Sequence, residues 1–375
     1  MVETAKPAAP RRAAAYQGGG FTYDRWMEAQ GVPIHRGYLI EDLRTVELGW
    51  WAERECNSAF IQLMGQEGVA EARVTEIPPG GSLAPLKLAI DEIVYVVEGR
   101  GLTTVWADGG EKTTFEWQKH SMFVIPHNYI HQLSNAQGDR PVRVLQYNYL
   151  PIAMSAVHDP SLFFNSPAGR PAPIDEDALY SEAREVDAAG SLVAARGVFW
   201  YGNFFPDMRA WDKLVPFRGR GAGGTTVFIG FPNSEMSCHM SVFPARTYKR
   251  GHRHGPGRAI VIPAGEGFSV LWEEGQEKIV VPWHEASMFV PPNRWFHQHF
   301  NVGGAPARYL ALHPLRQFAG RSERVEDRER DQIDYTREDP WIRQKFEEEL
   351  AKRGIRSDMP EEAYRIKDYE WGYDD

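Results

Sequence analysis

The chain has 375 residues, of which 42% are hydrophobic and 25% are charged. This is the composition of a globular protein, and the length suits two domains of ordinary size. The formal net charge is −9, and the lack of a long basic run excludes nucleic acid as an expected partner, because phosphate binding needs clustered Lys and Arg.

The first 20 residues are rich in Ala, Pro and Gly, and we expect residues 1–20 to be disordered. They contain no apolar signal-peptide core. The chain also lacks the run of about 18 apolar residues that would span a membrane. Its two cysteines, Cys56 and Cys238, lie in no CxxC or His/Cys cluster, as is typical of a reducing compartment. We therefore expect a cytoplasmic protein without a membrane partner.

Residues 21–155 predict a first β domain. An entry segment of some helical character, 21–50, precedes short β-type runs. Residues 93–97 read IVYVV before a Glu-Gly-Arg-Gly turn, and an apolar run over 102–106 follows. Short strands with Gly and Pro between them, and without helical periodicity, are typical of an all-β sandwich or barrel.

After a Pro- and Ala-rich linker with a short helix, 156–200, residues 201–318 repeat the first domain. Residues 121–131 read SMFVIPHNYIH and residues 287–297 read SMFVPPNRWFH, a shift of 166 positions (287 − 121). The same register pairs Gly101 with Gly267, Trp117 with Trp283 and Asn135 with Asn301. Duplication of a folding unit explains this match, and the sequence therefore predicts two tandem barrels.

The last segment, 319–375, predicts an arm with one helix. Asp339 suits the N-cap, Pro340 the first turn, and Gly354 the end of the helix. Trp341, Phe346 and Leu350 are expected near one face. A helix of this length needs a packing partner, so we expect it on the barrel or on a neighbouring subunit.

Three histidines in the second repeat predict a metal site. Residues i and i+2 of a strand share a face, so His252 and His254 of the segment GHRH would both enter the barrel. His297 would enter from a later strand. Buried imidazoles are costly unless something uses their nitrogens, and a divalent metal does so.

The HxH pair followed by PxxxxHxxxN resembles the two metal motifs of the cupin superfamily, here on the second copy of a duplicated barrel as in bicupins. The resemblance implies two tandem cupin barrels, also described as double-stranded β-helix or jelly-roll barrels. Cupins usually add a glutamate ligand shortly after HxH. Arg258 stands at that position, which implies a three-histidine site similar to that of gentisate-type dioxygenases.

The first repeat lacks this ligand set. Leu86 and Leu88 stand where the second repeat has its HxH pair, while Glu92 and His131 remain at the two other motif positions. Two isolated ligands make a poor metal site. The sequence therefore indicates a structural N-terminal barrel without metal, and the alternative is a second small-molecule pocket that uses Glu92 and His131.

Further residues around the motif are candidates for substrate contact. His299 lies two positions after His297 and is a candidate fourth ligand, general acid/base or packed core histidine. Arg258 is a candidate clamp for a substrate carboxylate or a partner of a structural acid. Trp272 and Trp295 are candidates for lining the pocket, with plain core packing as the alternative.

Three neutral imidazoles leave the full +2 charge of a metal, so the site favours an anionic substrate. We expect one divalent metal per chain, Fe(II) first, with Mn, Ni, Cu or Zn as alternatives. The hypothesis is a dioxygenase that uses O2 to cleave a C–C bond of an aromatic or enolisable hydroxy- or carboxylate substrate. The alternative is a non-redox hydrolase, lyase or isomerase of a small carboxylate or ureido substrate. Bicupin resemblance also implies a homo-oligomer.

Overall fold

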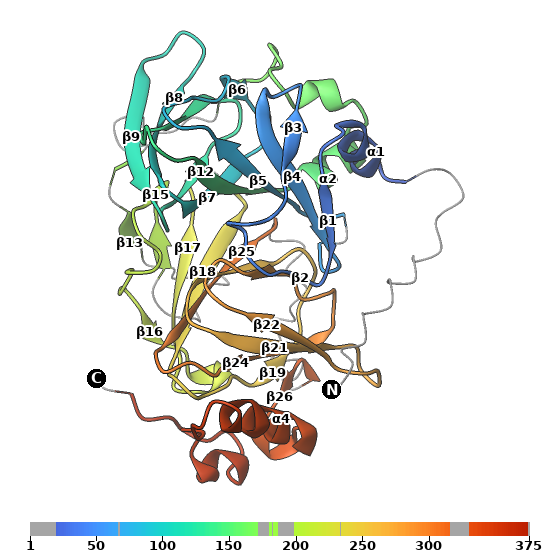
Figure 1. The fold of residues 1–375 in the computed structure, drawn as a ribbon, viewed down its shortest axis with the longest axis vertical. Helices are drawn as coiled ribbons and strands as arrows, with labels where there is room; N and C mark the ends of the chain where they lie inside the picture. The colour runs from blue at the N-terminus through green and yellow to red at the C-terminus, as the bar shows by residue number, and fades with distance from the viewer. Residues whose placement is uncertain are drawn as a thin grey trace.

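The computed structural model describes residues 20–66, 68–171, 180–181, 183–186, 199–232, 234–315 and 330–373. Within these residues, two β barrels lie one above the other, and a helical arm follows the second barrel (Figure 1). The predicted all-β class, with two tandem barrels and a helical C-terminal extension, is confirmed. The predicted disorder at the N-terminus lies outside the described residues except for residue 20, as does part of the 156–200 linker.

The N-terminal barrel is built from two sheets. The larger sheet has the strand order β1 (Ile34–Gly37), β4 (Cys56–Leu63), β5 (Glu71–Ile77), β12 (Val142–Asn148), β7 (Glu92–Glu98), β10 (Met122–Ile125) and β15 (Phe204–Phe205), with β3 (Gly49–Trp51) on β4. The smaller sheet has the order β6 (Leu86–Lys87), β11 (Ile130–Asn135), β8 (Arg100–Trp106) and β9 (Lys112–Gln118).

The C-terminal barrel repeats this plan. Its larger sheet has the order β13 (Arg184–Val186), β14 (Phe199–Tyr201), β17 (Thr225–Gly230), β18 (Ser237–Phe243), β25 (Ala307–His313), β20 (Ala259–Ala264), β23 (Met288–Phe289) and β2 (Leu39–Ile40), with β16 (Val215–Pro216) on β17. Its smaller sheet has the order β22 (Ile279–Trp283), β21 (Gly267–Trp272), β24 (Phe296–Asn301), β19 (Gly251–His252) and β26 (Gln332–Ile333). Each strand of the first barrel has a counterpart in the second, which adds β13 and β26 at the sheet edges.

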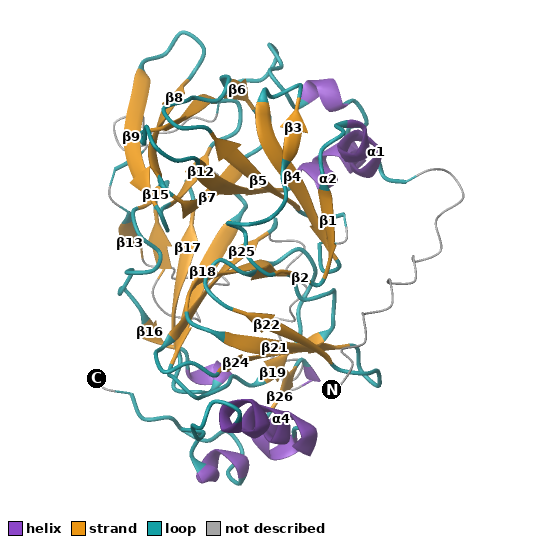
Figure 2. Cartoon of the chain, in the orientation of Figure 1, coloured by secondary structure: helices purple, strands orange, loops and turns teal. Residues whose placement is uncertain are grey.

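Helices occupy the periphery of this β structure (Figure 2). Two lie beside the N-terminal barrel, α1 (Thr22–Ala29) and α2 (Leu150–Ala156), and α4 (Pro340–Ala351) lies below the C-terminal barrel. Short 3-10 helices are η1 (Pro160–Leu162), η4 (Arg218–Arg220), η6 (Tyr335–Arg337) and η7 (Glu361–Tyr364). No helix of the described residues is long and apolar enough to cross a membrane.

The repeated residues hold the same geometry in both barrels. A Cβ on Gly267 would collide with the Phe300 carbonyl oxygen and lie 2.6 Å from the Trp283 ring. In the first barrel, a Cβ on Gly101 would lie just as close to the Ser134 carbonyl oxygen and to the Trp117 ring. Only glycine allows this approach of strand, backbone and indole, which explains why both copies carry it.

The two barrels exchange strands. From the entry segment, β2 pairs with β23 of the C-terminal barrel, and β15, which follows the linker, pairs with β10 of the N-terminal barrel. A serine hydroxyl supports each exchange: Ser287 Oγ donates to the Glu41 carbonyl and Ser121 Oγ to the Pro206 carbonyl, both at 2.6 Å. One apolar cluster, which includes Met122 of the first barrel and Cys238 of the second, spans the interface.

The C-terminal arm packs on its own barrel. Asp339 caps α4 by accepting a hydrogen bond from the Trp341 N–H, as the sequence predicts. The buried face consists of Ile342, Phe346 and Leu350, and the Phe346 ring lies 4.9 Å from the Tyr248 ring. The prediction that Trp341 shares this face is wrong: the side chain is 37% exposed, because it lies one position off the i, i+4, i+8 stripe.

Candidate metal centre

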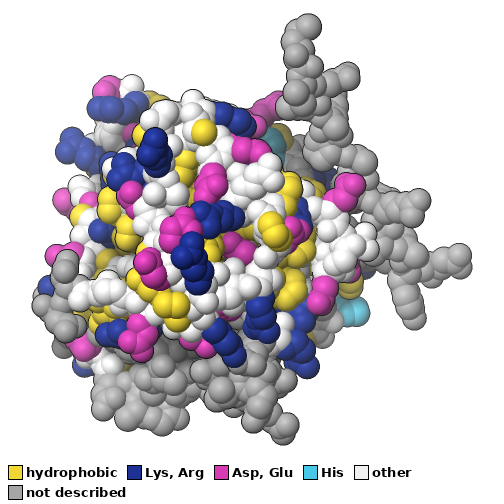
Figure 3. Space-filling view, turned by 90° about the horizontal axis from the view of Figure 1, so that it is seen from below, with side chains coloured by type: hydrophobic (Ala, Val, Ile, Leu, Met, Phe, Trp, Pro, Cys, Tyr) yellow, Lys and Arg dark blue, Asp and Glu magenta, His cyan; other side chains and the backbone are white. Residues whose placement is uncertain are grey.

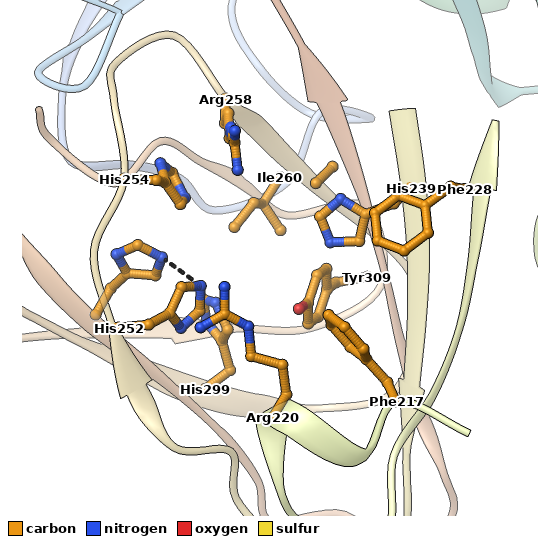
Figure 4. A pocket seen from close by; sticks show the side chains of 12 residues that line it. Phe217, Arg220, Phe228, His239, His252, His254, Arg258, Ile260, His299 and Tyr309 are labelled. Atoms are coloured by element: carbon orange, nitrogen blue, oxygen red, sulfur yellow. Dashed lines mark hydrogen bonds between the residues drawn. The ribbon is translucent and has the colours of Figure 1, made fainter. Parts of the chain in front are cut away.

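The barrel topology brings the three predicted ligands together. His252 on β19 pairs directly with His297 on β24, and His254 follows β19 two residues later. The histidine rings face one cavity inside the C-terminal barrel (Figure 4). One ligand atom from each of the three lies within 4.8 Å of the others, and this is the one such group among the described residues.

Hydrogen bonds orient each imidazole. The Nδ1 atoms lie near backbone carbonyl oxygens: His252 Nδ1 is 3.4 Å from Arg250 O, His254 Nδ1 is 2.7 Å from Gly255 O, and His297 Nδ1 is 3.2 Å from Trp295 O. A carbonyl oxygen only accepts, so these contacts favour the Nδ1–H tautomer. The Nε2 lone pairs are then left for another partner.

The spacing of those Nε2 atoms fits a metal. His252 Nε2 and His297 Nε2 lie 3.1 Å apart. Two nitrogens at right angles on a metal about 2.1 Å from each are about 3.0 Å apart. With both protons on Nδ1, the two lone pairs would repel each other unless a cation lies between them. The arrangement of carbonyl, imidazole and open nitrogen is also the usual support of metal-binding histidines.

Burial keeps the three imidazoles neutral. All are at most 5% exposed. Desolvation holds the pKa of His252 and His254 well below the ordinary value, with nearby Arg220 and Arg258 adding to the effect. It lowers the pKa of His297 to about 3. Neutral imidazoles are the form that binds a metal, so near pH 7 the site is ready without proton release.

The cavity is small and cationic. Its free volume is about 20 Å³, and it is lined by residues without any carboxylate, namely Phe217, Arg220, Phe228, His239, His252, His254, Arg258, Ile260, His297, His299, Tyr309 and Ala311. Arg258 and Arg220 reach toward it from opposite sides in Figure 4. An arginine on each side of a cavity without acidic lining favours an anion.

The other sequence-predicted site residues divide into two groups. Arg258 and His299 line the cavity. His299 stays outside the three-ligand group, and its Nδ1 lies 2.8 Å from Ser269 Oγ. Trp272 and Trp295 do not line this cavity. Strand alternation turns Trp272 outward, where it stacks on Phe296 with ring centroids 5.6 Å apart.

Among the polar lining residues, sequence reasoning missed Arg220, His239 and Tyr309. The available signals were weak. His239 alternates on β18 with the buried Cys238 and Met240 of the interface cluster, so strand periodicity alone places it on the barrel side. Arg220 lies in a loop region that no periodicity describes.

A buried lysine lies behind the cavity. Lys249 is fully buried, and its Nζ contacts the Ser241 hydroxyl and lies 3.5 Å from the Tyr309 hydroxyl. It forms no ion pair with any residue that the structure describes. Desolvation therefore holds the pKa of Lys249 well below its ordinary value.

The N-terminal barrel holds its two remaining motif residues differently. Glu92 is fully buried and forms an ion pair with Arg73 at 3.0 Å. His131 lines a separate cavity. Within the described part of the chain, neither belongs to a group of three potential metal ligands.

No model of a known protein family matches the chain, and no protein of curated function matches it either. Solved structures resemble it in architecture. A single-residue mutant of Bacillus subtilis oxalate decarboxylase has a TM-score of 0.46 and 8% identity, and the match covers 76% of this chain and 78% of that one.

Two further structures show the same level of likeness. Lactobacillus farciminis oxalate decarboxylase in a formate complex has a TM-score of 0.47 and 11% identity, with 75% of this chain and 87% of that chain covered. The 7S globulin of Momordica charantia has a TM-score of 0.44 and 13% identity, with 73% and 83% covered. No conclusion about function follows from these likenesses.

Proposed function

We propose that this chain is a metal-dependent enzyme that acts on a small anionic substrate, with His252, His254 and His297 as the metal ligands. The observation that carries the proposal is the spacing of His252 Nε2 and His297 Nε2, 3.1 Å apart, with each Nδ1 held by a carbonyl. A storage or purely structural barrel has no use for buried imidazoles arranged in this way.

Within this proposal, the first candidate reaction is oxidation by O2. Three neutral ligands leave positions open for a bidentate carboxylate and for O2, and Fe(II) is the metal we expect first. A metal held by His252, His254 and His297 would supply Lewis acidity and one-electron chemistry for C–C bond cleavage by O2. The cavity is small, about 20 Å³, so it favours a small enolisable hydroxy- or oxo-carboxylate over an aromatic ring.

The residues of the chain would bind and orient this substrate. Arg258 and Arg220 would hold the carboxylate from opposite sides, as bidentate donors. His299 would move a proton while the Ser269 hydroxyl fixes its ring. The buried wall of Phe228 and Ile260 would exclude water.

One contact favours a second candidate, non-redox lyase or hydrolase chemistry. His239 lines the cavity, and its Nδ1 lies 2.7 Å from Nε2 of the partly buried His313. Two linked imidazoles can pass a proton between a site and solvent. Such a relay is useful when a Lewis acid polarises the substrate and the rate depends on proton transfer.

The first prediction concerns metal content. Anaerobically purified protein should contain about one metal ion per chain, and His252→Ala should lose it, because removal of one of three ligands leaves the site incomplete. Elemental analysis measures this, with His284→Ala, an exposed histidine far from the group, as the matched control. Iron together with O2 uptake on small oxo-acids supports oxidation.

Manganese or zinc without O2 uptake supports the non-redox alternative. Equal metal content in the wild type and in His252→Ala would contradict the site itself, whatever metal is present. Both proteins should also be reconstituted with Fe(II) before analysis. This distinguishes a variant that cannot bind metal from a protein that lost its metal during purification.

A further inference from the structure

The N-terminal barrel contains a cavity of its own. Its free volume is about 30 Å³, and none of its lining residues is acidic. Two cationic side chains, Arg54 and Arg73, and the buried imidazole of His131 line it together with leucines. It lies at the place in this barrel that the metal centre occupies in the other.

The two cavities share an arginine stacked on an aromatic ring. Arg54 and Arg220 are related by the repeat shift of 166 positions (220 − 54), as are Trp51 and Phe217. The Arg54 guanidinium lies 5.6 Å from the Trp51 ring, and that of Arg220 lies 5.9 Å from the Phe217 ring. The N-terminal barrel thus lacks the metal ligands but retains the cationic side chain at its cavity.

The charge of Arg54 is not neutralised within the fold. Its contacts are with the rings of Trp51 and Phe164, and it forms no ion pair with a described residue. Arg73, in contrast, pairs with Glu71 and Glu92 behind the cavity. Burial raises the pKa of the Glu71 carboxyl. The buried cluster of Arg73, Glu71 and Glu92 is therefore closer to electrical neutrality.

His131 adds a buried polar group to the cavity lining. The side chain is 2% exposed, and its buried Nδ1 forms no hydrogen bond of normal geometry, although the Tyr129 backbone lies beside the ring. A buried polar atom without a partner is costly. Its ring belongs to the cavity lining, so a bound ligand could engage the imidazole.

We propose that the N-terminal barrel holds a second, metal-free site for a small monocarboxylate, with Arg54 pairing with the carboxylate and His131 forming a hydrogen bond to it. The volume limits the ligand to the size of formate or acetate. Leu83, Leu86 and Leu133 form the apolar wall for its C–H or methyl end.

The test uses the full chain carrying His252→Ala, so that no metal in the other barrel can bind the probe. Binding of 13C-labelled acetate and of formate is followed by NMR line broadening and by calorimetry. Adding Arg54→Gln should weaken binding at least about tenfold, because the charged hydrogen bond is lost. The control Arg356→Gln, at an exposed arginine outside both cavities, should leave this binding within about twofold, and Arg220→Gln reports any binding in the other cavity.

Leu86→Phe provides a second variant that keeps all charges but fills the cavity, and it should also abolish binding. Circular dichroism confirms that each variant folds; if Arg54→Gln does not, Leu86→Phe decides. Acetate binding that survives Leu86→Phe, or that is lost only with Arg220→Gln, overturns the proposal. Metal content of Arg54→Gln alone should equal that of the wild type, so failure here leaves the proposed function of the other barrel intact.

Discussion

At the scale of single residues, the barrel interior of the C-terminal half is dominated by nitrogen bases without carboxylates. The three ligand histidines, His299 and Lys249 are all buried within it. Desolvation keeps these bases neutral or lowers their proton affinity. This lining is stable while its bases are neutral, or while a bound anion or metal ion balances them. Binding at the site therefore stabilises the fold.

The free-energy cost of burying a base in this interior can be measured at Lys249. Because its pKa is lowered in the folded chain, the unfolded chain binds an extra proton between that lowered pKa and about pH 10.4, and stability rises with pH across this window. Each unit of lowering costs the fold about 1.4 kcal/mol at neutral pH. Lys249→Met should therefore raise the free energy of unfolding at pH 7 and flatten its rise between pH 7 and pH 10.

Guanidinium unfolding at several pH values measures the difference between the wild type and Lys249→Met. The exposed Lys213 provides the control, since Lys213→Met should change neither stability nor its pH dependence appreciably. A Lys249→Met protein that is less stable at pH 7, with the wild-type pH slope, would show that the amine is charged and satisfied in the fold.

At the scale of elements, the C-terminal arm completes the sheet that carries His252 and His297. β26 of the arm pairs with β19, so that Gln332 lies opposite His252. Gln332 also accepts from Arg220 and donates to the Gly219 carbonyl. The arm therefore holds both a ligand strand and a cavity arginine in place. Its outer face carries Lys and Arg interspersed with Asp and Glu (Figure 3), including the α4 pair Lys345–Glu349.

Glu338 tests the docking of this arm. It lies just before α4 and accepts hydrogen bonds from the Tyr248 hydroxyl and from Gln298 Nε2. Burial raises its pKa to about 7. Between about pH 4.3 and pH 7 the folded chain therefore binds a proton that the unfolded chain lacks, and stability falls as pH rises through this window. The loss amounts to about 3–4 kcal/mol.

Glu338→Gln should remove that loss, because the amide stays neutral and its oxygen still accepts a hydrogen bond. Urea midpoints at pH 5 and pH 7.5 should converge in this variant and differ in the wild type. The exposed Glu362→Gln serves as the control. Parallel pH profiles for the wild type and Glu338→Gln would mean that the carboxylate is already ionised in the docked arm.

At the scale of the whole molecule, the exchanged strands make the two barrels one cooperative unit. Each large sheet ends in a strand from the other half of the chain, and the interface cluster is continuous. The Tyr147 hydroxyl of the first barrel also donates to the Gly257 carbonyl of the second at 2.6 Å. Unfolding either barrel would expose the apolar face of the other.

We therefore expect one calorimetric transition for the full chain. Gly267→Ala, which forces a Cβ against the Phe300 carbonyl oxygen, should destabilise by about 3 kcal/mol and shift that single transition downward as a whole. Gly304→Ala, with open space around the added Cβ, should leave it nearly unchanged. Two resolved transitions, with only one shifted by Gly267→Ala, would show independent barrels.

The sequence by itself determined the duplicated β architecture and the grouping of three histidines inside the second barrel. Both depend on local rules: strand periodicity puts His252 and His254 on one side, and an internal repeat shows the unit without any knowledge of its contacts. The capped C-terminal helix follows from equally local signals at Asp339 and Gly354.

Only the tertiary structure decided which residues complete each cavity. Arg220 and Tyr309 reach the metal centre from segments far apart in the chain, and Trp272, on a strand next to a ligand strand, faces away from it. Strand exchange between the barrels was equally hidden, because β2 and β15 have two residues each. Contacts between distant segments depend on how sheets close and pack, and no spacing along the chain encodes that closure.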